Sequence, residues 1–103
     1  MESFDFKIIT EGSFQDAGYD IRTVVIRLNP CAMDEYYSSA ADVGTLFETK
    51  ETWEDYRARK KAERICWERK ILDKLKFKKL SGFSITRSLS EIFTVVLFER
   101  AEK

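Results

Sequence analysis

A stretch without glycine or proline, Thr52 to Lys79, constrains the fold more than any other part of the chain. It holds both tryptophans, and residues 51–80 carry eleven of the 18 basic side chains. Thr52, followed three residues later by Asp55, is typical of a helix N-terminus, where a side-chain oxygen accepts a backbone N–H. Acidic residues at the start and lysines at the end also match the helix dipole. The stretch therefore predicts one long helix.

At about 100° per residue, this helix would carry two nearly opposite apolar stripes. The first, here called the tryptophan stripe, consists of Trp53, Tyr56, Trp67, Ile71 and Leu75. The second, the alanine stripe, consists of Ala58, Ala62, Ile65, Cys66 and Leu72. A helix on one sheet needs only one apolar stripe. Either the tryptophan stripe packs on a sheet and the alanine stripe on a second helix, or the alanine stripe meets the sheet and the tryptophan stripe faces a partner.

Apolar alternation predicts strands on both sides of the helical region. The four expected strands are Phe4–Ile8, Ile21–Leu28, 77–87 (interrupted by Gly82) and Ile92–Glu99. In the first, Phe4, Phe6 and Ile8 would face the core. The last is apolar on both faces and is therefore expected to be a central strand.

The connections complete the fold. Residues 11–19, which contain two glycines, are expected to be a loop, and Ser88 to Ser90 a turn. Asn29 followed by Pro30 predicts the start of a short helix over about 31–43. We therefore expect a single α+β domain, residues 1–103, in the order β-β-α-α-β-β. Its mostly antiparallel four-stranded sheet would carry one short and one long helix on one face.

The chain is expected to be a soluble cytoplasmic protein. It begins without the apolar run of a signal peptide, and its longest nearly apolar run, Ile92 to Phe98, is too short to span a bilayer. The spacing of Cys31 and Cys66 matches no zinc or redox motif. Two free, buried thiols in a reducing compartment are expected, in preference to a disulfide between them.

No catalytic motif is present. The chain has no histidine, which removes the commonest general base and the commonest neutral metal ligand. It has no glycine-rich phosphate loop, Rossmann fingerprint or nucleophile elbow. The sequence thus favours a protein that is not an enzyme and has no cofactor or metal.

A binding protein is the preferred interpretation. Trp, Tyr and Arg are the residue types enriched at interface hot spots. The partner-binding candidates are Trp53, Tyr56, Arg57, Lys60, Arg64 and Trp67. The protein would then be an inhibitor, adaptor or accessory subunit, such as a phage or mobile element encodes. Its partner would be another protein, or a second copy of the chain in a homodimer.

Nucleic-acid binding by the basic helix, residues 52–79, is the alternative. The phosphate-binding candidates are Lys74, Lys76, Lys78 and Lys79. Glu63 and Glu68 interrupt the basic series, and the net charge of the chain is zero. A dedicated phosphate-binding face would be more uniformly basic, so a protein partner is preferred.

Overall fold

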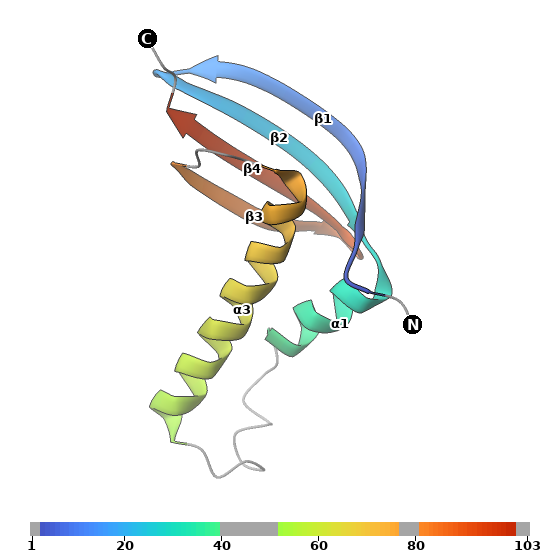
Figure 1. Cartoon of the computed structure of the whole chain (residues 1–103), viewed down its shortest axis with the longest axis vertical. Coiled ribbons are helices and arrows are strands. Elements are labelled where there is room, and N and C mark those ends of the chain that lie inside the picture. Colours follow the sequence, from blue (N-terminus) through green and yellow to red (C-terminus); the bar gives the residue numbers. More distant parts are fainter. Residues whose placement is uncertain (1–2, 40–51, 77–80, 101–103) are drawn as a thin grey trace.

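The computed structural model describes residues 3–39, 52–76 and 81–100 and confirms the α+β fold (Figure 1). Four strands form one antiparallel sheet in the order β1-β2-β4-β3, and both helices lie on one of its faces. The elements are β1 (Phe6–Asp16), β2 (Tyr19–Leu28), α1 (Pro30–Ser39), α3 (Trp53–Leu75), β3 (Gly82–Leu89) and β4 (Ile92–Arg100). The expected order β-β-α-α-β-β is observed.

The first hairpin is longer than expected, and the prediction of a loop over 11–19 was wrong. β1 continues to Asp16, and only Ala17 and Gly18 separate it from β2. Both have positive φ, 50° and 81°, as a two-residue type I′ turn requires. Gly12, which suggested a loop, lies within β1 opposite Thr23.

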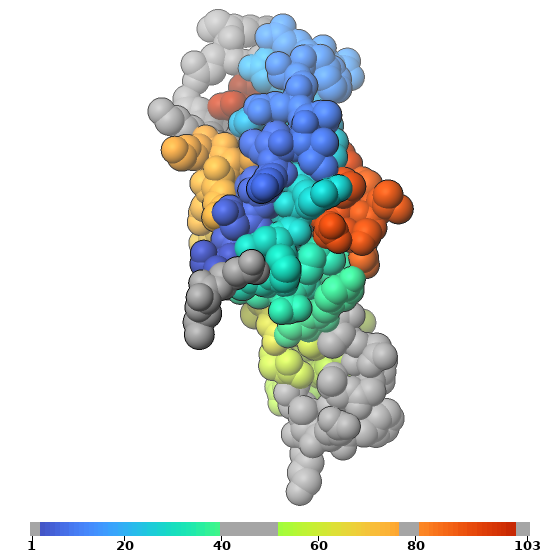
Figure 2. Space-filling model, turned by 90° about the vertical axis from the view of Figure 1, so that its right-hand side faces the viewer, coloured from blue at the N-terminus to red at the C-terminus, as the bar shows by residue number. Residues whose placement is uncertain are grey.

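β1 is an edge strand that is exposed along almost its whole length (Figure 2). Phe4 and Phe6 pack against the core as expected, but Ile8 is 48% exposed. The register of β1 shifts between Ile8 and Thr10, which marks a β-bulge. Ile8 was therefore assigned to the core wrongly, because alternation alone does not show where the covering helices end.

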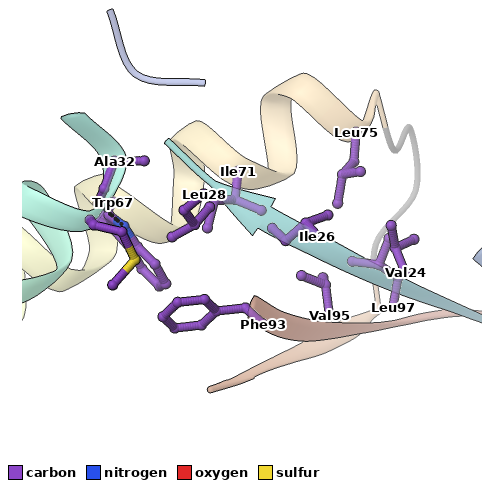
Figure 3. Close-up of a cluster of buried hydrophobic side chains, with 11 residues drawn as sticks. Val24, Ile26, Leu28, Ala32, Trp67, Ile71, Leu75, Phe93, Val95 and Leu97 are labelled. Carbon is purple, nitrogen blue, oxygen red and sulfur yellow. Dashed lines mark hydrogen bonds between the residues drawn. The ribbon is translucent and has the colours of Figure 1, made fainter. Parts of the chain in front are cut away.

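The core lies between the two central strands and the helices (Figure 3). Alternate residues of β2 and β4 point to the helix side, where they pair across the strands as Val24 with Val95 and Ile26 with Phe93. α3 contributes Trp67, Ile71 and Leu75, and α1 contributes Ala32 and Met33. β4 is central, as its two apolar faces predicted.

The tryptophan stripe is thus the one that meets the sheet, through Trp67, Ile71 and Leu75 in the second half of α3. This arrangement was expected together with an alanine stripe packed on the second helix, but the alanine stripe does not pack on α1. Its members Ala58, Ala62, Ile65 and Cys66 are exposed, and only Leu72 packs against the core. This corrects the expectation that both stripes are covered within the fold.

The predicted helix starts are confirmed. The Thr52 hydroxyl accepts a hydrogen bond from the backbone N–H of Asp55 at 3.1 Å. Asn29 Oδ1 likewise accepts the N–H of Ala32 at 2.9 Å. α1 extends to Ser39, and its predicted continuation over 40–43 lies outside the described residues. α3 ends at Leu75, and the C-cap residue Lys76 has a left-handed backbone with φ 55°.

Neither cysteine forms a disulfide, but their predicted burial was wrong. Cys31 is half-buried, and Cys66 is exposed because it belongs to the alanine stripe. Neither α1 nor α3 is both long and apolar enough to cross a membrane.

Candidate functional site

The predicted partner-binding residues fall into two groups along α3. The outer group, Trp53, Tyr56, Arg57 and Lys60, lies in the first third of the helix. The inner group, Arg64 and Trp67, lies where α3 passes α1 and the sheet. The two groups therefore do not form one continuous exposed surface.

The outer group is largely engaged in contacts within the chain. Trp53 is 47% exposed, and its ring stacks on that of Tyr56 with centroids 5.8 Å apart. The Arg57 guanidinium lies 5.4 Å from the Trp53 ring centroid. Lys60 donates a hydrogen bond to the carbonyl of Ser38 at 2.5 Å, which ties α3 to the end of α1.

Trp67 belongs to the core, not to the surface. Its side chain is 4% exposed, and its indole N–H donates to the carbonyl of Ala32 at 3.1 Å. Its ring packs against those of Tyr36 and Phe93, with centroids 5.3 and 5.4 Å away. Tyr56 is also buried, at 6%. The sequence prediction that Trp67 and Tyr56 present their rings to a partner therefore needs correction, because a buried ring offers a partner little contact area.

A cleft of about 220 Å³ opens beside Trp67, between α1, α3 and β3. Tyr36, Trp67 and Phe93 line it with aromatic rings. Its other lining residues are mostly polar or charged: Ser39, Arg64, Glu68, Ile85 and Arg87. The cleft brings together two residues of the predicted set, Arg64 and Trp67, with residues from α1 and β3.

Arg87 is the most constrained charged side chain of the cleft. Its guanidinium carbon lies 5.6 and 5.4 Å from the ring centroids of Tyr36 and Tyr37. Its Nε–H donates to the carbonyl of Ser90 at 2.5 Å, and Nη2 donates to the hydroxyl of Tyr37 at 3.0 Å. A guanidinium has five N–H donors, so three of them, two on Nη1 and one on Nη2, make no hydrogen bond to the described residues. Within the described residues, no carboxylate lies within 4 Å of it.

The cleft carries more positive than negative charge. Arg64 is 70% exposed and lies 3.9 Å from Glu68, a distance at which the pair is only loosely associated. Two guanidinium groups thus share the cleft with one carboxylate. Arginine binds planar carboxylates through two parallel hydrogen bonds. The cleft can accordingly take an anionic group next to an aromatic surface.

The lysine cluster is only partly described. Lys74 forms an ion pair with Asp5 at 2.6 Å, and this hydrogen bond is the main cause that holds the pKa of Asp5 below its usual value. Lys76 is the C-cap residue that follows α3, and Lys78 and Lys79 lie outside the described residues. A phosphate bound at Lys74 would have to compete with Asp5.

Other basic residues of α3 are also near carboxylates. Arg59 and Lys60 lie 3.2 and 3.4 Å from Glu63, and Lys70 lies 2.6 Å from Glu35. The bond to Glu35 raises the pKa of Lys70. Nucleic-acid binding by the helix stays a prediction, but these contacts lower the charge that α3 could offer to phosphates.

Sequence reasoning missed Arg87 and Tyr36. The signal for Arg87 was its position two residues after Ile85, which places it on the helix side of β3 among apolar residues. The signal for Tyr36 was its place in the helical spacing that follows Pro30. Only the tertiary contact between α1 and β3 brings the two together.

No protein-family model, curated protein or solved structure matches the chain. The described residues contain no group of three or more cysteine, aspartate or glutamate side chains that could hold a metal ion.

Proposed function

We propose that the protein acts by binding another protein, and that the cleft between α1, α3 and β3 receives an acidic side chain of that partner. The observation that carries the proposal is Arg87, held in place by two tyrosines and a carbonyl while keeping three N–H donors. Because its position is already fixed, little side-chain entropy would be lost on binding.

The size of the cleft favours a side chain over a free metabolite. Pockets for small molecules and cofactors enclose about 300–1,000 Å³, whereas this cleft has about 220 Å³. That volume suits one anchoring side chain of a protein. Tyr36 and Trp67 supply the apolar wall that accompanies such anchors at interface hot spots.

The chemistry of the cleft suits an aspartate or glutamate. The carboxylate would accept hydrogen bonds from Arg87, and Arg64 of α3, which also lines the cleft, would add a second positive charge. An inhibitor, an adaptor or an accessory subunit would each work through such a contact, without catalysis.

Charge reversal at the cleft tests this proposal. The wild-type protein, used as bait in extract from its source cells, is expected to retain a partner, and Arg87→Glu is expected to lose it. Removing one partner of a hydrogen-bonded charge pair at an interface costs about 2–5 kcal/mol, so the dissociation constant should rise at least about tenfold. Surface plasmon resonance with the retained partner measures that change.

Arg57→Glu is the matched control. It makes the same charge change as Arg87→Glu, but Arg57 lies on α3 and does not line the cleft. It should bind like the wild type. If Arg57→Glu loses the partner and Arg87→Glu keeps it, the interface is the outer end of α3 and the cleft proposal is wrong. Circular dichroism must show that both variants are folded.

A further inference from the structure

The face of the sheet opposite the helices is uncovered within the described residues (Figure 1). Since side chains alternate along a strand, the neighbours of the buried core residues point to this side. Cross-strand pairs there include Ile21 with Phe98 and Thr23 with Val96. Ser84 of β3 lies opposite Val96 on the same side. We call this surface the open face.

The centre of the open face contains no charged residue. Its positions are Thr10, Gly12, Phe14, Ile21, Thr23, Val25, Ser84, Thr86, Thr94, Val96 and Phe98. Charged residues make up 35% of the whole chain, so eleven positions without any charge differ clearly from the chain average. Five of the eleven are threonine or serine, polar residues of the kind that an antiparallel sheet presents to water, but none is charged. Depletion of charge and the presence of aromatic residues are instead typical of an interface core.

We propose that the open face binds the open face of a second copy of this chain. Two such sheets would stack face to face at about 10 Å, with the threonine, valine and isoleucine side chains interdigitated. A net charge of zero means that two copies do not repel each other. A twofold axis is the commonest symmetry of homo-oligomers, and it places the same patch of both copies in the interface.

The charges of β1 at the two ends of the open face fit this symmetry. By register, Lys7 of β1 and Arg27 of β2 lie at one end, and Asp16 of β1 and Arg100 of β4 lie at the other. A twofold axis between the sheets that reverses the strand direction would bring Lys7 of each copy towards Asp16 of the other. The two ends would then form the same opposite-charge pair.

Mass measurement tests the proposal. Size-exclusion chromatography with light scattering should give twice the 12.1 kDa of one chain at micromolar concentration. Thr23→Lys places a charge in the uncharged centre and should raise the dimer dissociation constant at least about a hundredfold. Ser13→Lys is the matched control: the same new charge, on the helix side of β1, with no loss of the dimer. A wild-type mass of one chain, or a Thr23→Lys dimer, would overturn the inference.

Further variants test the twofold arrangement and its independence from the cleft. Lys7→Asp should weaken the dimer, and the double variant with Asp16→Lys should restore it, because the pair is then reversed rather than lost. No restoration would overturn the proposed twofold arrangement. Arg87→Glu should leave the mass unchanged, since Arg87 points to the helix side of β3. Dimerisation and the cleft can therefore fail independently.

Discussion

Trp67→Ala should lower the free energy of unfolding by about 3–5 kcal/mol, the usual cost of truncating a buried large aromatic residue. The indole is 4% exposed, contacts the rings of Tyr36 and Phe93, and donates to the carbonyl of Ala32. Its removal would leave a cavity where α1, α3 and β4 meet. Urea unfolding followed by far-ultraviolet circular dichroism measures the change without relying on tryptophan fluorescence.

Trp53→Ala is the control for this substitution, because it removes the same side chain from the same helix. Trp53 is 47% exposed at the first turn of α3, and among the described residues its ring contacts are with Tyr56 and Arg57. Its loss should cost about 1 kcal/mol or less, the range measured for exposed aromatic and cation–π contacts. Equal effects of the two variants would show that α3 does not seat on the sheet through Trp67.

Ile71→Ala should destabilise the protein by about 2–5 kcal/mol. The side chain is fully buried between α3 and the central strands (Figure 3). Ile65→Ala removes the same atoms from the alanine stripe, where the side chain is 49% exposed. It should lower the free energy of unfolding by well under 1 kcal/mol, because alanine also has the higher helix propensity, which offsets part of the loss. The same urea titration compares them.

The result that would contradict the assignment of the stripes is a larger loss for Ile65→Ala than for Ile71→Ala. It would mean that the alanine stripe, and not the tryptophan stripe, packs on the sheet.

The sequence predicted the elements well where local chemistry determines them. Thr52 and Asn29 start helices because their side chains satisfy backbone N–H groups of the next turn. β4 is central because both of its faces are apolar. The length of β1 was missed because Gly12 and Gly18 suggest a loop, although only Gly18 lies in a turn. A glycine in a strand and a glycine in a turn look alike without the register.

The candidate site was harder to predict, because it depends on which apolar stripe of α3 meets the sheet. Two stripes of similar length do not settle that from helical periodicity alone. Once the tryptophan stripe is placed on the sheet, Trp67 becomes the wall of a cleft, and Arg87 from β3 becomes its neighbour. These residues are 20 positions apart and belong to different elements, so no local pattern joins them.

The two tryptophans offer the most direct test of the cleft, because each gives one indole N–H signal in a nitrogen-15 correlation spectrum. The Trp67 signal reports on the cleft, and the Trp53 signal reports on the outer end of α3. Conservative Trp→Phe variants assign the two signals. On titration with the partner that the wild-type protein retains, the Trp67 and Arg87 Nε–H signals should shift while the Trp53 signal stays in place. A shift confined to Trp53 would contradict the cleft as the binding site.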